Sequence, residues 1–314
     1  MPTLLAMDEV RVAWVTDADA RKAKSVSRAY GVESVSLPEN LDDLPKSDIV
    51  LLAIPYGARD PYYEALRGRN IAIYAEKPFS RSVEHHQRIC SWFPEHRLAC
   101  GYQRRGWGPT LLAKEMVEAE LFGQLRSVRY GFGGPGVVVG GRYNSNARLA
   151  GGGVLFEVGI HGLDATIFIT SATAAKVKNA TMVIDNGLEL HVKADLILTT
   201  PHVESISCEL TASWLEQTVE RIEFHFDDAV MTFSLFSSGD VTIRARDGKH
   251  SFLLTKSTRS YPLTSTETFY EFWSSFLAGL RFEQANFTSA SRSILTTEAI
   301  ENMYRLAALV NGGS

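Results

Sequence analysis

The feature that most constrains the fold is an almost unbroken apolar run, DIVLLAIP, at residues 48–55. Such a run is typical of a strand covered on both faces, as strands of parallel sheets are. It follows a β-branched run at residues 10–16 and a basic, alanine-rich segment at residues 20–30 that ends at Gly31. The order strand, helix, strand predicts βαβ units, with residues 48–55 as a central strand of a parallel sheet.

The alternation continues to about residue 102, and after it strands follow one another. Turn sequences such as Asp185-Asn186-Gly187 predict hairpins there. We therefore expect two domains of α/β plus α+β class. Residues 1–102 form a doubly wound parallel sheet, and residues 103–314 form an open antiparallel sheet with helices on one face, the last helices returning toward the first domain. In the first domain the remaining expected strands are 32–37, 71–75 and 98–102, and the helices are 60–66 and 81–93; in the second the strands are 175–184, 188–199, 203–212, 219–226, 230–235 and 241–245, and the helices are 109–121, 156–170, 268–279 and 289–309.

Composition excludes several function classes. A net charge of -4 and a pI near 6.1 provide no basic surface for nucleic acid or an anionic membrane, so a small-molecule partner is expected. The 3 cysteines have no close spacing, which favours neither disulfides nor a metal site and indicates a reduced, cytoplasmic setting. No apolar run has the length of a membrane span, and the first residues do not resemble an export signal.

The tripeptide Glu76-Lys77-Pro78 directly follows the predicted strand at residues 71–75. Open α/β sheets bind their ligands at the carboxyl ends of parallel strands, so Lys77 is placed where a catalytic lysine can act. The alternative is a solvated lysine before a proline turn.

A second motif begins at Gly151-Gly152-Gly153 and contains Glu157, His161 and Asp164. If the chain is helical after the glycines, these three side chains share one helix face. A carboxylate beside an imidazole orients the ring and raises its basicity, as a general acid/base requires. The alternative is a surface pair on a helix preceded by a capping glycine run.

Together and in this order, the two motifs resemble the signatures of the glucose-fructose oxidoreductase/inositol dehydrogenase (Gfo/Idh/MocA) family. The likeness extends over nearly the whole chain. It implies a Rossmann-like first domain and an NAD(P)-dependent oxidoreductase that moves hydride to or from a hydroxyl or carbonyl carbon of a sugar, cyclitol or related small molecule. It also implies a homo-oligomer, a dimer or tetramer.

The resemblance implies roles for particular residues. Lys77 and His161 would be catalytic, and Glu157 would stand where the family usually has aspartate. Asp164 and Arg105 would be substrate residues, although an arginine at that place is more often structural. The positions implied for the cofactor are Asp17, Ile54, Pro55, Glu76, Lys77 and Pro78.

Asp17 ends the first predicted strand and matches the acidic residue that binds the adenosine ribose and repels a 2′-phosphate, which favours NAD over NADP. The alternative is that Asp17 and Asp19 belong to an ordinary strand-to-helix turn. No metal site is expected.

The family's first strand and its Gly-x-Gly-x-x-Gly turn are missing from the start of this sequence, and three explanations are open. The chain could begin at an internal methionine, the strand at residues 10–16 could pair directly with residues 48–55, or a partner could complete the sheet. The pattern does occur at residues 131–136, but we interpret it as a connecting loop because valines rather than a helix follow it. A non-redox protein that reuses the substrate cleft is therefore the competing function.

Overall fold

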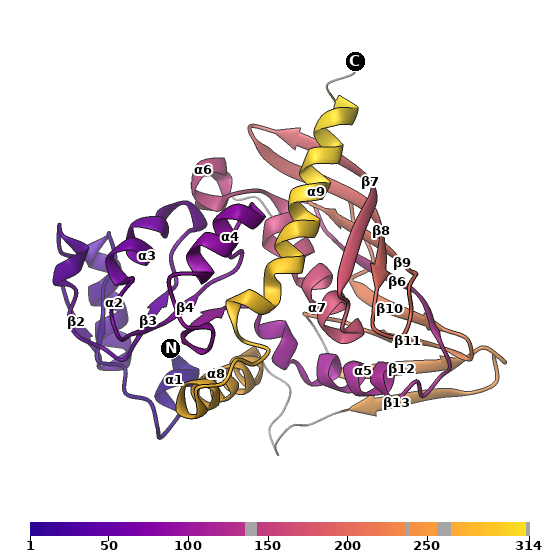
Figure 1. The fold of residues 1–314 in the computed structure, drawn as a ribbon, viewed down its shortest axis with the longest axis horizontal. Helices are drawn as coiled ribbons and strands as arrows, with labels where there is room; N and C mark the ends of the chain where they lie inside the picture. Colours follow the sequence, from indigo (N-terminus) through magenta and orange to yellow (C-terminus); the bar gives the residue numbers. More distant parts are fainter. Residues whose placement is uncertain (136–142, 237–238, 256–264, 312–314) are drawn as a thin grey trace.

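A computed structural model describes residues 1–135, 143–236, 239–255 and 265–311 of the chain. Figure 1 shows small parallel sheets formed by the first hundred residues beside one large sheet formed by the second part of the chain, with helix α9 (Ile294–Asn311) between them. A Rossmann-like parallel sheet followed by a larger, mainly antiparallel sheet with helices confirms the expected fold class.

Three parallel strands, β3 (Ile49–Leu52), β4 (Ala72–Ala75) and β5 (Leu98–Cys100), form one sheet in that order. Side chains of β4 alternate between its two faces. Ile73 belongs to the main core with residues of α3 (Asp60–Leu66) and α4 (Val83–Cys90). Tyr74 points the other way and stacks on Trp273 of α8 (Ser265–Phe282) at 4.8 Å between ring centroids. A helix from near the end of the chain therefore covers the second face of this sheet.

The expected central position of the strand at residues 48–55 is wrong. In the described part of the chain β3 pairs only with β4, while β1 (Trp14–Val15) and β2 (Glu33–Ser34) form a separate two-stranded parallel sheet, joined by α2 (Ala20–Tyr30). Direct pairing of residues 10–16 with residues 48–55 is wrong for the same reason. An apolar sequence indicates that a strand is buried, but it does not indicate which strands form backbone hydrogen bonds with it.

Helix α1 (Pro2–Leu5) packs below this region. Leu4 and Met7 are buried in a cluster with Phe272, Trp273 and Phe276 of α8. The first and last parts of the chain thus share one apolar core beside β4 and β5 (Figure 1).

The second sheet has eight strands in the order β13-β12-β11-β10-β6-β9-β8-β7. All neighbours are antiparallel except β6 and β9, which pair in parallel. The strand β13 was not predicted. The helices α5 (Gly108–Glu118), α7 (Ile160–Thr170) and α9 lie on one face (Figure 1). The strands are β6 (Leu125–Gly133), β7 (Ala174–Asp185), β8 (Leu188–Thr199), β9 (Ile206–Ser213), β10 (Arg221–Phe226), β11 (Ala229–Phe233), β12 (Asp240–Ala245) and β13 (Ser251–Thr255).

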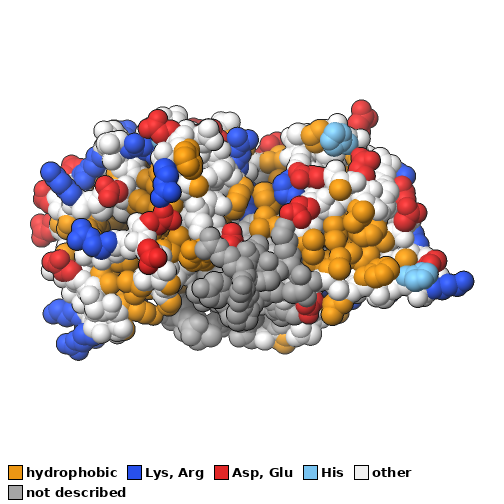
Figure 2. Space-filling view, turned by 90° about the horizontal axis from the view of Figure 1, so that it is seen from below, with side chains coloured by type: hydrophobic (Ala, Val, Ile, Leu, Met, Phe, Trp, Pro, Cys, Tyr) orange, Lys and Arg blue, Asp and Glu red, His pale blue; other side chains and the backbone are white. Residues whose placement is uncertain are grey.

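One helical stretch, Ala147–Thr170, is long and apolar enough to cross a membrane. Its most apolar window is 89% buried within the protein, as expected of a core helix. Figure 2 shows acidic and basic side chains interspersed over one face of the molecule rather than gathered into a band of one sign.

Candidate active site

Arg59 organises the carboxyl ends of β3 and β4. Its guanidinium is 2% exposed and donates hydrogen bonds to the backbone carbonyls of Ile54 at 3.0 Å, Pro78 at 2.7 Å and Lys77 at 3.3 Å, and also to that of Glu76. One buried cation therefore joins both strand-end loops, because a guanidinium can donate to several backbone carbonyls at once. Sequence reasoning missed Arg59, whose only signal is its place just before α3.

Lys77 connects the two sheets. The peptide bond between Lys77 and Pro78 is cis. The Lys77 Nζ donates to the carbonyl of Glu157 at 2.7 Å and to that of Phe156 at 3.3 Å. Burial lowers the pKa of the Lys77 ammonium, and the carboxylates of Glu76 and Glu157 oppose that shift. The two motifs found in the sequence are therefore brought together, 80 residues apart in the chain.

Glu157 and His161 lie in one continuous helical stretch, in which residues Leu155–Gly159 form a π-helical turn before α7. No hydrogen bond joins the Glu157 carboxylate to the imidazole within the described residues. Glu157 instead accepts a hydrogen bond at 3.3 Å from the amide of Asn144, a buried residue on a segment that the sequence did not single out. The carboxylate therefore lies beside Asn144 and close enough to Lys77 to act on its charge, and its orientation of the imidazole stays a prediction.

His161 is 5% exposed, and its Nδ1 is buried without a hydrogen-bond partner. Its ring meets the ring of Phe236 edge-on, with 5.6 Å between centroids. Burial, followed by the positive charges of Lys77 and Arg104, holds the pKa of His161 well below its usual value of 6.5. The imidazole is therefore neutral at neutral pH and able to accept a proton.

Asp164 and Arg105 pair with each other. The Asp164 carboxylate accepts hydrogen bonds from Arg105 Nε at 2.8 Å and Nη2 at 2.6 Å, and one from the Thr296 hydroxyl at 2.9 Å. Arg105 also donates to the carbonyls of Phe287 and Arg292. The side chains of the pair are 1% and 3% exposed. This geometry favours a structural role over the expected contact with substrate.

Asp17 lies at the end of β1. Its Oδ1 accepts a hydrogen bond at 2.8 Å from the backbone of Asp19, and Asp19 in turn caps α2 by accepting from the backbone of Arg21. The turn alternative thus has a structural basis for both aspartates. One oxygen of Asp17 is used in this way. Burial raises the pKa of the neighbouring Tyr62 phenol, and the negative charge of Asp17 adds to that shift.

The glycine runs have packing functions. A Cβ on Gly153 would lie 2.2 Å from the carbonyl oxygen of Glu189, so the π-helical turn can approach β8 only through glycine. Gly131 and Gly133 belong to β6, and a Cβ on either would collide with backbone oxygens of residues 216–219. The glycines at residues 131–133 therefore serve close packing of backbone. Gly136 and the valines after it lie outside the described residues.

The residues present fit both ends of a dinucleotide. Asp17 follows β1, Pro55 follows β3 and Lys77 follows β4, so all three lie at carboxyl ends of parallel strands, where nucleotides bind in open α/β sheets. The orphaned Nδ1 of His161 is a buried polar atom that a bound hydroxyl or carboxamide would satisfy.

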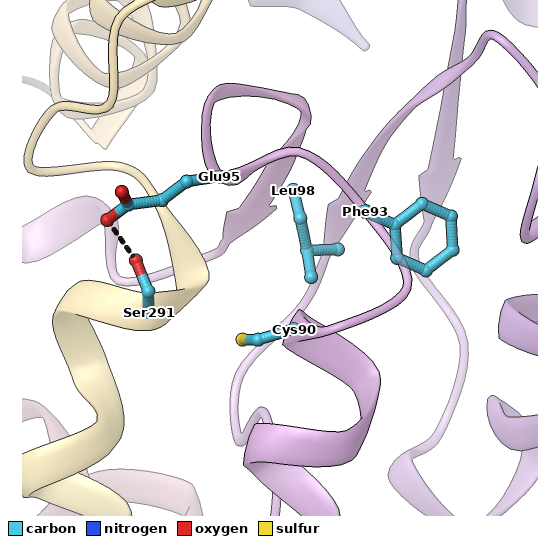
Figure 3. Close-up of a pocket in the computed structure, with 5 residues that line it drawn as sticks. All are labelled: Cys90, Phe93, Glu95, Leu98 and Ser291. Carbon is cyan, nitrogen blue, oxygen red and sulfur yellow. Dashed lines mark hydrogen bonds between the residues drawn. The ribbon is translucent and has the colours of Figure 1, made fainter.

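Two hollows lie apart from these strand ends. Figure 3 shows a cavity of about 230 Å³ between Cys90, Phe93 and Leu98, with the Ser291 hydroxyl donating to Glu95 at its rim. Leu98 begins β5, so this cavity is at the end of the sheet opposite Lys77. A more open hollow of about 350 Å³, lined by Ser145, Leu190 and Trp214 among others, lies at the edge of the large sheet.

Comparisons with known proteins agree with this geometry. Residues 1–103 match the model of an oxidoreductase family with an NAD-binding Rossmann fold, and residues 110–232 match the GFO/IDH/MocA C-terminal domain. The curated dTDP-3,4-didehydro-2,6-dideoxy-alpha-D-glucose 3-reductase of Streptomyces antibioticus is 26% identical over 212 residues, which are 64% of this chain and 61% of that protein.

Solved structures share the fold. A levoglucosan dehydrogenase in complex with NADH and levoglucosan superposes with a TM-score of 0.83 at 15% identity, covering 98% of this chain and 92% of the other. A 3-ketoreductase of Actinomadura kijaniata in complex with NADP and TDP-benzene gives 0.81 at 17% identity, covering 97% and 92%.

Two matched models of one family cover residues 1–103 and 110–232, and the strand-end Lys77 is brought against the turn before His161. The chain therefore belongs to the Gfo/Idh/MocA oxidoreductase family, with an NAD-binding Rossmann fold as its first part.

Proposed function

We propose that this chain is an NAD(P)-dependent oxidoreductase that acts at a hydroxyl or carbonyl carbon of a sugar, cyclitol or related small molecule. The single observation that carries the proposal is the contact of Lys77 Nζ with the carbonyls of Phe156 and Glu157. It holds a cation at the carboxyl end of β4 next to the turn that leads to a buried, neutral His161.

Each side chain has a defined task in this proposal. When bound, the nicotinamide supplies or accepts the hydride. The neutral His161 takes the proton of the substrate hydroxyl at Nδ1 during oxidation and becomes an imidazolium. In the reverse reaction the imidazolium gives a proton to the substrate oxygen and becomes neutral again. The Lys77 ammonium stabilises negative charge that develops on the substrate oxygen. The Glu157 carboxylate accepts hydrogen bonds from other hydroxyls of the substrate, and the Asn144 amide donates to them.

We place Asp17 at the adenosine ribose, with NAD preferred over NADP because a carboxylate repels a 2′-phosphate. Arg105 and Asp164 are assigned to the support of α7 rather than to substrate. Support for the sugar class comes from the named activities of the relatives, which act on a dTDP-linked deoxysugar and on levoglucosan.

The experiment is a titration of the purified chain with NADH and with NADPH, followed by cofactor fluorescence and by heat of binding. We expect micromolar binding of NADH, weaker binding of NADPH, and near-equal binding of the two by Asp17→Ser. Sugar and cyclitol substrates are then screened by nicotinamide absorbance. Absence of binding up to millimolar cofactor would contradict the proposal and favour the non-redox alternative.

A further inference from the structure

Arg104 is a charged group at the site that makes no side-chain hydrogen bond to the described residues. It lies on the short helical turn Gln103–Gly106, next to the fully paired Arg105. In the described part of the chain its side chain makes no hydrogen bond, and its Nε is buried without a partner. A guanidinium carries five N–H donors, and the Nε–H of Arg104 is the one that is both withdrawn from water and unpaired.

Aromatic rings fix where the guanidinium lies. Its central carbon is 4.7 Å from the ring centroid of Phe236 and 5.3 Å from that of Trp107. The same Phe236 ring contacts His161 edge-on. Arg104 and His161 therefore flank one ring, which sets the guanidinium beside the proposed acid/base while its hydrogen-bonding edge stays without a protein partner.

The charges around Arg104 do not compensate it. Glu220 is the carboxylate that faces it, and the Ser234 hydroxyl already donates to Glu220. Burial lowers the pKa of the Arg104 guanidinium, and the attraction of Tyr130 and Glu220 only opposes this shift. An additional negative group within hydrogen-bonding distance would remove the imbalance.

Arg105 shows which geometry such a group would adopt. It binds the Asp164 carboxylate through Nε and Nη2, the side-on bidentate arrangement that guanidinium and carboxylate favour. Resting on the proposed function, we propose that Arg104 binds an oxyanion of the substrate in the same way, so that the substrate is an acidic sugar derivative carrying a carboxylate or a phosphate. Arg104 is then a specificity-determining residue, and its Nε is the atom that the anion pairs.

The test compares binding of D-glucuronate, D-glucose 6-phosphate and D-glucose by calorimetry, with and without NADH. These probes differ in one group, so the first two distinguish a carboxylate from a phosphate. We expect one acid to bind at least about 10-fold more tightly than D-glucose, since a hydrogen-bonded charge pair contributes that much or more. Arg104→Met should weaken that acid about 10- to 100-fold and leave D-glucose unchanged, and Arg104→Lys should restore part of the loss.

Arg129→Met is the matched control, because Arg129 pairs with Glu209 and is exposed on the sheet; it should change neither affinity. Three results would each overturn the assignment. They are equal binding of the acids and D-glucose, no binding of either acid up to millimolar concentration, and an equal loss of affinity for all probes in Arg104→Met. The two proposals fail separately. If an acid binds through Arg104 but no nicotinamide is turned over, the proposed function is contradicted and this inference is not. If only neutral sugars are turned over, this inference is contradicted and the proposed function is not.

Discussion

Two polar clusters lie along helix α7, one helical turn apart, and they differ in how completely they are paired. In the closed cluster, Arg105 and the Thr296 hydroxyl donate hydrogen bonds to the Asp164 carboxylate, and the ion pair is buried away from water. The open cluster consists of Lys77, His161 and Arg104. In it, the His161 Nδ1 and the Arg104 Nε are buried and have no partner among the described residues. The closed cluster has the pairing expected of groups that hold the fold, whereas the open cluster combines unpaired atoms with charge at the carboxyl end of β4, where a ligand could pair them.

Incomplete pairing has an energetic cost. A buried polar atom without a partner destabilises a protein by about 1–3 kcal/mol, so the open cluster is less stable by itself than it would be with a ligand. Changes in the open cluster should therefore affect turnover while sparing stability, and changes in the closed cluster should do the reverse.

The largest effect is expected in the open cluster, for His161→Asn. Removing a general acid/base lowers kcat by about 10²–10⁴-fold. Stability should be nearly unchanged, because the Nδ1 of His161 has no bond to lose. The measurements are kcat on an accepted substrate and the urea midpoint of unfolding. The matched control is His86→Gln, a change at a buried histidine whose two ring nitrogens contact Thr297 and Ala290 and none of the reacting groups, which should leave kcat within a few-fold. Full activity of His161→Asn would remove His161 from the mechanism.

The next largest effect is expected in the closed cluster, for Arg105→Met. Breaking a buried ion pair from one side leaves an unpaired Asp164 carboxylate and costs about 3–5 kcal/mol of the free energy of unfolding. Urea unfolding measures it. The double variant Arg105→Met with Asp164→Leu removes both charges and should recover much of that loss. A single variant as stable as the parent would show that the pair does not support α7.

The smallest of the three effects is a pH dependence of stability. His86 is buried and fully paired, with the Thr297 hydroxyl at 2.8 Å and the carbonyl of Ala290 at 3.0 Å, and burial lowers its pKa from 6.5 to about 4. Between these values the unfolded chain binds a proton that the folded chain does not, so stability should fall on acidification from pH 6.5 toward pH 4, by at most about 3 kcal/mol from this residue.

The buried His161 acts in the same direction, since burial and two nearby positive charges lower its pKa as well. Thermal unfolding at several pH values measures the combined slope, and the difference between the parent and His86→Gln isolates the share of His86. An unchanged slope in that variant would show that His86 is not protonated on unfolding in this range.

Much of the secondary structure could be predicted from the sequence. The helix at residues 60–66 and the strand at residues 188–199 were found with their observed bounds, because apolar periodicity and turn residues are local signals. The strand β13 was missed. Its Phe252 and Leu253 are exposed, so no alternation of buried and exposed residues marked it.

The site divides in the same way. Lys77, Glu157 and His161 were singled out from motif order, and the structure joins Lys77 to the turn that carries Glu157. Arg59, Arg104 and Asn144 were not assigned to the site, because their meaning comes from partners distant in the sequence. The π-helical turn also escaped detection, since the need for it lies in the approach of Gly153 to β8.

The sequence alone determined the order of strands and helices, the family likeness and the chemical types of the reacting groups. Each of these follows from neighbours in the chain, where side-chain period and turn chemistry act. Only the tertiary structure decided that β1 pairs with β2 apart from β3, and that Asn144 donates to Glu157. It also decided that Arg105 pairs with Asp164, whereas the Arg104 Nε has no partner among the described residues. Those outcomes depend on backbone ladders and on hydrogen bonds between distant segments, and burial makes their geometry decisive because most polar atoms withdrawn from water are paired in a folded protein.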